Sequence, residues 1–188
     1  MRKITSSDSS ERHSGAADGW IGRVESIHIA PSAGQQMMGL DEVRAVPGRG
    51  LEGDRYFNNS GYYSGVSSVG GREVTLIERE AIAHLDGGVI AASGTTLEMR
   101  LAGGESRRNI VTSGVPLNHL LGREFWVGEV VMRGGRLCEP CNYLEGLTLR
   151  PGLRMALQHR GGLRATILNE GVIRTGDAVR VKAAEEPA

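Results

Sequence analysis

The sequence lacks the features that mark secreted, membrane-spanning or nucleic-acid-binding proteins. Its 188 residues include only two cysteines, too few for the disulfide framework of a small secreted domain. No apolar run reaches the roughly 18 residues that a membrane span needs, and the N-terminus has no apolar centre like that of a secretory signal. The formal net charge is zero, so bulk charge does not favour nucleic acid or a membrane surface as a partner. We therefore expect a cytoplasmic protein whose cysteines rest as thiols.

Lysine is also scarce, because Lys3 and Lys182 are the only lysines among 22 basic residues. Arginine suits bidentate binding of phosphate or carboxylate, although a biased genome composition explains the same excess. A charged ligand of this neutral chain has to be bound by a local cluster of side chains.

Common nucleotide-binding and hydrolase motifs are missing or incomplete. The segment "GRGLEG" (48–53) matches the G-x-G-x-x-G pattern, but the "DRYFNNSGYYSG" that follows cannot form the helix whose N-terminus must bind a pyrophosphate. The sequence has no Walker A motif, no H-E-x-x-H and no G-x-S-x-G nucleophile elbow. These absences exclude the standard dinucleotide, P-loop and serine-hydrolase templates.

The sequence does contain a series of short β-type runs that end at glycine turns. Leu163, Ala165 and Ile167 alternate with polar residues, as do Val179 and Val181, which predicts strands with one buried face. Glycine accounts for 28 residues, about twice its usual share, and implies many tight turns and bends. The predicted strands lie within 20–29, 38–46, 71–77, 124–134, 163–171 and 177–181.

Helical patterns are confined to 79–85 and 151–160. Many short strands and few helices predict a mainly β domain of the α+β class, built as a distorted barrel. The Ser-rich residues 1–18 have no periodic apolar positions and are predicted to form a disordered tail. We expect a single domain over residues 19–188.

Both cysteines lie in "RLCEPCNYLEG" (136–146) as a C-x-x-C pair. Structural zinc needs four ligands, and the five histidines show no H-x-x-x-H spacing that would complete the set. A thioredoxin-type couple is expected after an early strand of a βαβ unit, not three-quarters along a β-rich chain. Both readings of the pair are therefore weak.

A single working thiolate fits the local sequence better. The run that ends in "MRGGRL" reads as a strand with a bend at Gly134-Gly135, and Pro140 can open a short helix over "NYLEG". Cys141 would then lie in the first helical turn, where unpaired backbone N–H groups stabilise a thiolate. Arg133 and Arg136 would add positive potential, and Glu139 would oppose it. Burial of both cysteines as small hydrophobic side chains is an equally good reading on position alone.

Several segments together resemble the MOSC domain, the module found at the C-terminus of molybdenum cofactor sulfurases and in small stand-alone bacterial proteins. The segment "GLEGDRYF" is similar to an early family motif, and "GREVTLIERE" to the strand and helix start that follow it. The remaining blocks are "RRNIVTSGVPLNHLLGREFWVG", "RLCEPCNYLE" and "GLRATILNEGVIRTGDAV". They run in family order from about Val24 to Val181.

The resemblance implies a closed β-barrel like that of pyruvate kinase, and it implies a functional role for the cysteine after proline. Cys141 would be a molybdenum ligand or a persulfide carrier, and Cys138 an additional thiol at the cofactor site. A thiolate is a soft ligand and a nucleophile, which suits both roles.

The resemblance also implies binders for the cofactor's phosphate. Arg107, Arg108 and Asn109 form a local basic cluster in a neutral protein, which would otherwise be read as a solvated strand end. Asp54 caps a turn or binds basic groups of the site, and Arg55 pairs with the cofactor or with Asp54.

Two functions follow from this resemblance. As an enzyme, the protein would bind molybdenum cofactor and reduce N-hydroxylated bases or related small molecules, with electrons from a separate redox partner, because no flavin, haem or iron–sulfur motif is present. As a carrier, it would hold cofactor or persulfide sulfur. The sequence has no pyridoxal-phosphate domain, so a separate cysteine desulfurase would supply that sulfur. The alternative from another class is a thiol-redox or zinc-binding module that uses Cys138 and Cys141 as a pair.

Overall fold

The computed structural model describes residues 20–65, 71–90 and 93–183. The tail predicted over residues 1–18 lies outside the described residues. Within the described ranges, no helix is long and apolar enough to cross a membrane.

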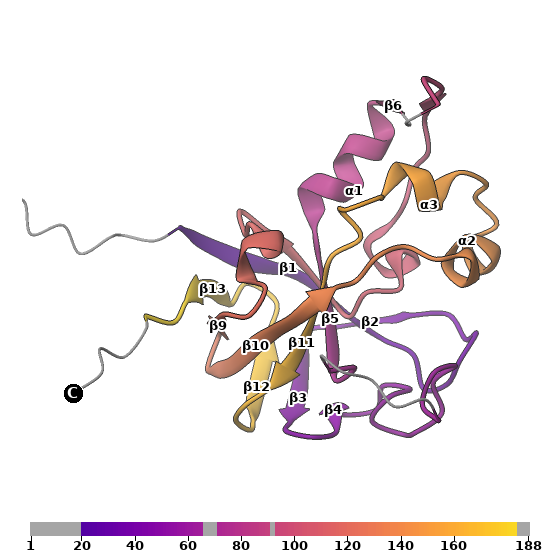
Figure 1. The fold of residues 1–188 in the computed structure, drawn as a ribbon. Coiled ribbons are helices and arrows are strands. Elements are labelled where there is room, and N and C mark those ends of the chain that lie inside the picture. Colours follow the sequence, from indigo (N-terminus) through magenta and orange to yellow (C-terminus); the bar gives the residue numbers. More distant parts are fainter. Residues whose placement is uncertain (1–19, 66–70, 91–92, 184–188) are drawn as a thin grey trace, which may run out of the picture.

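Seven strands close into a barrel (Figure 1). Their order around it is β13-β9-β10-β11-β5-β8-β1, and pairing of β1 with β13 closes the ring. The β5–β8 pair is parallel, and the other pairs of the barrel are antiparallel. The strands are β1 (Ile21–Ile29), β5 (Val74–Glu78), β8 (Ile110–Ser113), β9 (Glu124–Val127), β10 (Val130–Leu137), β11 (Leu163–Ile167) and β13 (Ala178–Val181).

Shorter elements extend or cover this barrel. Strand β2 (Met38–Leu40) pairs with β1, and a separate sheet contains β3 (Glu42–Val46), β4 (Gly50–Leu51) and β12 (Gly171–Arg174). A two-stranded ribbon is formed by β6 (Val89–Ile90) and β7 (Thr96–Leu97). The helices are α1 (Arg79–Asp86), α2 (Asn142–Thr148) and α3 (Leu153–Ala156), with two 3-10 turns, η1 (Gly103–Ser106) and η2 (Leu117–Leu120).

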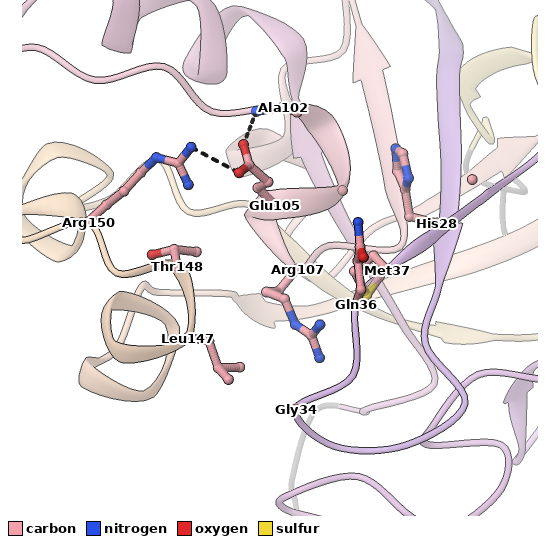
Figure 2. Close-up of a pocket in the computed structure, with 12 residues that line it drawn as sticks. His28, Gly34, Gln36, Met37, Ala102, Glu105, Arg107, Leu147, Thr148 and Arg150 are labelled. Carbon is pink, nitrogen blue, oxygen red and sulfur yellow. Dashed lines mark hydrogen bonds and ion pairs between the residues drawn. The ribbon is translucent and has the colours of Figure 1, made fainter.

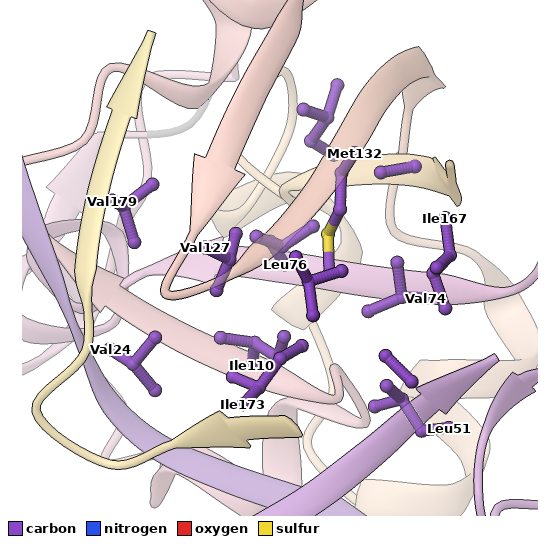
Figure 3. Packing of buried hydrophobic residues seen from close by; sticks show 14 of the residues in the cluster. Val24, Leu51, Val74, Leu76, Ile110, Val127, Met132, Ile167, Ile173 and Val179 are labelled. Carbon is purple, nitrogen blue, oxygen red and sulfur yellow. The ribbon is translucent and has the colours of Figure 1, made fainter. Parts of the chain in front are cut away.

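Alternating apolar residues fill the barrel (Figure 3). Leu163, Ala165 and Ile167 of β11 are buried, as their alternation predicted. On β13, Val179 is fully buried while Val181 is only partly covered and packs against the edge of the core. Because successive side chains of a strand point to opposite faces, one face of each strand joins the core and the other is left for solvent or for a second layer.

That second layer lies over β5 and β8, whose outer faces are also buried. Leu76 and Ile110 point into the barrel core, whereas Ile77 and Val111 join a second apolar cluster with residues of α1, α2 and α3. Cys141 packs against this second cluster. The helices therefore cover the parallel pair from outside, and the cysteine lies where this layer meets the barrel.

The structure confirms the predicted fold class and corrects several element bounds. The run 38–46 is divided into β2 and β3, and 124–134 is divided by a turn at Gly128, whose φ is 57°. The predicted bend at Gly134-Gly135 appears as a register shift between Gly134 and Arg136. Helix α3 covers only part of 151–160 because Gly152 adopts a left-handed φ of 88°, and β8 and β12 were not predicted. The segment "GRGLEG" is followed by turns, with no helix over residues 54–65.

We predict that Gly162→Ala destabilises the barrel by about 2–4 kcal/mol. Gly162 has a φ of 104°, and a Cβ there would overlap the backbone carbonyl of Leu76 on the neighbouring strand. Urea denaturation measures the change in the free energy of unfolding. Gly146→Ala is the matched control, because a Cβ in α2 would meet nothing and alanine favours helix by about 0.5–1 kcal/mol. Equal stability of the two variants would contradict the close packing at Gly162.

Candidate functional site

Cys141 begins helix α2 as its N-cap residue. Its backbone is extended, with φ −135° and ψ 168°, and its carbonyl accepts a hydrogen bond from the Glu145 N–H at 3.1 Å. The side chain makes no capping hydrogen bond and is partly exposed. The prediction that Cys141 lies in the first helical turn was therefore wrong by one position, because N-cap residues keep non-helical dihedrals while their carbonyl starts the helix.

Cys138 has a different environment from Cys141. It is only 2% exposed, its N–H donates to the Gly162 carbonyl at 2.7 Å, and its carbonyl accepts from Arg108 Nη2 at 2.8 Å. Both cysteines are free thiols. The described residues contain no group of three or more His, Cys, Asp or Glu side chains that could hold a metal ion. This asymmetry favours one working thiol and gives the zinc hypothesis no support.

Arg108 lines the cavity at Cys141, but its guanidinium is committed to backbone carbonyls. It is 6% exposed. Nε donates to Gly161 at 2.7 Å, Nη1 to Ser106 at 3.1 Å and Nη2 to Cys138 at 2.8 Å. Arg108 therefore holds three segments together, and it binds the cysteine-bearing connection to the barrel.

Asp54 is also a structural residue. It is 1% exposed, and Oδ1 accepts hydrogen bonds from the Ala30 N–H, Arg55 Nη1 and Asn109 Nδ2 at 3.2, 2.9 and 3.1 Å. Oδ2 accepts from the Tyr56 N–H at 3.2 Å. These bonds fix the "GLEGDR" turn against the end of β1, which is the structural role considered for Asp54 from the sequence.

Asn109 completes this buried polar network. Its Oδ1 accepts from the N–H and the hydroxyl of Thr75 at 3.2 and 2.8 Å, and its Nδ2 also donates to the His28 carbonyl at 3.1 Å. Because its amide is fully used within the protein, Asn109 joins β1, β5 and β8. It does not line either of the two cavities described below.

Arg55 and Arg107 provide the positive charge of the site. Arg55 pairs with Asp54 at 2.9 Å and donates to the Arg107 carbonyl at 3.2 Å. Arg107 has a left-handed φ of 60°, its guanidinium donates to the Gln35 carbonyl, and it forms no ion pair within the described part of the chain. Burial lowers the pKa of Arg107, and the nearby charge of Arg55 lowers it further. An anion beside Arg107 would relieve both effects.

Two cavities meet at Arg107 and Leu147. The smaller, of about 70 Å³, is lined by Cys138, Cys141, Arg55, Arg107, Arg108, Arg164 and by tyrosines. The larger, of about 530 Å³, lies between α2, η1 and the β1–β2 connection. In Figure 2, Arg107 lies between Leu147 and the Gly34–Met37 segment, with the Glu105–Arg150 ion pair of 2.9 Å on the rim. The side chains of Arg107 and Leu147 are therefore part of the wall of both cavities.

Tyrosine is concentrated at the smaller cavity. All four tyrosines of the chain line it, and the sequence reasoning missed them. The rings of Tyr62 and Tyr143 stack with centroids 4.3 Å apart, and Tyr63 packs edge-on against Tyr62 at 4.8 Å. The pKa of Tyr63 is raised by burial, and then by the charge of Cys141 and a hydrogen bond with it. The sequence feature that could have predicted this tyrosine cluster is the run "YFNNSGYY", which follows the "GLEGDR" turn.

The charges near Cys141 differ from those expected. Arg133 pairs with Glu124, and neither Arg133 nor Arg136 lines the two cavities. The arginines that line the smaller cavity are Arg55, Arg107, Arg108 and Arg164. Glu139 does line the smaller cavity. Its carboxylate accepts the His159 N–H at 3.0 Å and lies 3.3 Å from Nδ1 of the same residue, which moderates its opposition to a thiolate.

The arrangement combines a soft, nucleophilic sulfur, a cation without a carboxylate partner and aromatic walls. Such a site can hold a thiophilic metal or a sulfane sulfur at Cys141. It can bind a phosphate at Arg107 and stack a planar ring on tyrosine.

Comparisons with known folds and families agree with this architecture. The structure is similar to that of YuaD from Bacillus subtilis, with a TM-score of 0.67 and 16% identity over 88% of this chain and 100% of that chain. It is also similar to YiiM from Geobacillus stearothermophilus (TM-score 0.60, 15% identity, 86% and 75% coverage) and YiiM from Escherichia coli (0.58, 16%, 88% and 72%). At these identities the likeness shows the fold alone. A comparison with curated protein sequences found no significant match.

The family assignment comes from a sequence model. The model of the MOSC domain matches residues 56–180, which include the tyrosine cluster, the Arg107-Arg108-Asn109 segment, both cysteines and most of the barrel strands. Because this match spans more than half of the sequence and contains the site, the chain belongs to the MOSC domain family.

Proposed function

We propose that this protein binds molybdenum cofactor, with Cys141 as the protein ligand of the metal and Arg107 as a binder of the cofactor's phosphate. One observation carries the proposal: the partly exposed thiol of Cys141 shares a cavity with Arg107, and Arg107 also lines a larger cavity. A pterin dithiolene that ends in phosphate needs a soft donor and a cation, and the residues present fit both needs.

The supporting residues divide into those that bind and those that position. Cys141 would hold the metal, while Arg107, with Arg55 beside it, would bind the phosphate. Arg108 keeps the Cys138–Cys141 segment in place through its three carbonyl contacts. When bound, molybdenum would supply two-electron oxygen-transfer chemistry to the site.

We infer that the reaction is the reduction of N-hydroxylated bases or similar small molecules in the cytoplasm, with electrons from a separate redox partner. The tyrosine-lined wall supports the choice of a planar substrate, because aromatic rings stack on planar heterocycles. Carriage of persulfide sulfur on Cys141, supplied by a cysteine desulfurase, is the alternative that uses the same partly exposed thiol.

We predict that Cys141→Ser loses molybdenum and pterin, whereas Cys138→Ala keeps them. Serine removes the soft donor at the cavity, and alanine at the buried Cys138 leaves its two backbone hydrogen bonds unchanged. Metal analysis and pterin release on protein from a cofactor-replete host measure both. Equal loss in the two variants would show a paired role for the cysteines. Protein without molybdenum or pterin but with cyanide-labile sulfur on Cys141 would establish the carrier.

We predict different outcomes for the two neighbouring arginines. Arg107→Gln should weaken cofactor binding on the order of 10- to 100-fold with little change in stability, because it removes a charge-assisted contact with the phosphate. Arg108→Gln should destabilise the fold by about 2–4 kcal/mol, because it leaves buried carbonyls unpaired. Titration of apo-protein with cofactor and urea denaturation measure the two effects. Arg154→Gln, at an exposed position of α3, is the control, and a cofactor affinity as low in this variant as in Arg107→Gln would contradict the assignment.

A further inference from the structure

Two arginines lie directly opposite each other on neighbouring barrel strands. Arg136 of β10 is in register with Arg164 of β11, just after the irregularity at Gly134. Residues opposite each other in an antiparallel pair project to the same face with Cβ atoms about 5 Å apart, and like charges at such positions are destabilising. The register therefore places two positively charged residues side by side, an arrangement that a bound anion would stabilise.

No such anion comes from the described part of the chain. Neither Arg136 nor Arg164 forms an ion pair among the residues that the structure describes. Glu139, on the wall of the same cavity as Arg164, is engaged by His159. Glu73 accepts the N–H groups of Gly48 and Ile167. The two guanidinium groups are thus available to a ligand.

The pair lies on the outer face of the barrel, on the side of the Cys141 cavity. Leu163 and Ala165 of β11 point into the core, so Arg164 between them points outward. Arg164 is also in register with Thr75 of β5, and both residues line the smaller cavity. Arg136 is exposed next to Arg164, which places the pair at one border of that cavity. Arg107, which both cavities share, marks another part of the wall.

The same cavity offers rings beside these charges. Tyr62, of which 61% is exposed, stacks on Tyr143 of α2, and both line the cavity with Arg164. Aromatic faces bind planar heterocycles by stacking, and arginine forks bind phosphate oxygens. Together they are the two elements that recognise a ring joined to a phosphate.

We propose that Arg136 and Arg164 form an anion site for the phosphate of a nucleotide-type substrate, separate from the Arg107 site for the cofactor. The inference rests on the proposed function only in placing the reacting group at Cys141. The proposed function requires only that the substrate contain a planar base. The present inference adds that the substrate is a nucleotide, in which that base is joined through a sugar to a phosphate monoester. On this proposal, the repulsion between the two arginines is offset when the phosphate binds between them.

Calorimetric titration of the purified full chain with AMP and with adenosine tests the proposal. The wild type should bind AMP at least about 10-fold more tightly than adenosine, because a bidentate phosphate contact is lost in the nucleoside. In Arg164→Gln and in Arg136→Gln this ratio should fall toward one, while adenosine affinity and the ratio in Arg154→Gln stay unchanged. Comparison of the two ligands in each variant removes any general effect on folding.

A ratio near one in the wild type, an unchanged ratio in both variants, or a ratio lost only in Arg107→Gln would overturn the proposal. Stability gives a second readout. Phosphate should raise the melting temperature of the two variants less than that of the wild type, because only Arg107 remains as a phosphate binder in them. Neither variant should melt below the wild type without phosphate, since each relieves a like-charge contact.

Failure of this proposal can be told apart from failure of the proposed function. Arg136→Gln, which changes a residue that lines neither cavity, should keep its molybdenum and pterin content, and Cys141→Ser should keep the preference for AMP over adenosine. If the protein prefers AMP but carries no cofactor, the anion site stands and the cofactor assignment fails. If it carries cofactor but binds AMP and adenosine equally, the cofactor assignment stands and the anion site fails.

Discussion

The placement of Cys141 depends on the buried guanidinium of Arg108. Three segments that are far apart in sequence, at Ser106, Cys138 and Gly161, each direct a carbonyl at it. A buried cation is costly without partners, and backbone carbonyls in a loop are equally costly when unpaired. The Arg108 guanidinium and the three carbonyls therefore satisfy each other's need for a hydrogen-bond partner. Cys138, in the connection between β10 and α2, is held at its carbonyl by Arg108 and at its N–H by the Gly162 carbonyl. The thiol three residues later is thereby presented at the cavity.

The neighbouring arginines Arg107 and Arg108 have different roles. Arg107 has a left-handed φ of 60°, and both arginines line the smaller cavity. The guanidinium of Arg108 is bound by three backbone carbonyls, whereas that of Arg107 forms no ion pair among the described residues. A comparable division holds around Asp54 and Asn109, whose hydrogen bonds stay within the protein. The groups that face the cavity are positioned by a buried polar framework whose hydrogen bonds are made within the protein.

Much of the fold was predictable because strand periodicity is a local property. The alternation in 163–167 and the glycine bend at Gly134-Gly135 both appear where the sequence placed them. Strand β8 was missed because its outer face is buried by the helical layer, so it lacks the alternation of a half-exposed strand. Helix α3 is shorter than predicted at both ends, because Gly152 has a left-handed backbone before its start and Leu157 leaves the helical dihedrals after Ala156.

The site was predictable only in part. The sequence by itself determined that both cysteines lie in one C-x-x-C segment and that Pro140 can open a short helix there. The structure decided that Cys141 is partly exposed and Cys138 is buried. The sequence also determined that any charged ligand must be met by local clusters of arginine. Only the tertiary structure decided which arginines can bind a ligand, because the guanidinium of Arg108 is hydrogen-bonded to carbonyls from segments that are distant from one another in the sequence. The tertiary structure likewise brings the tyrosines of 56–63 and Tyr143 to one cavity. The register of β10 with β11 sets Arg136 opposite Arg164, and strand register is a non-local property that no short window of sequence contains.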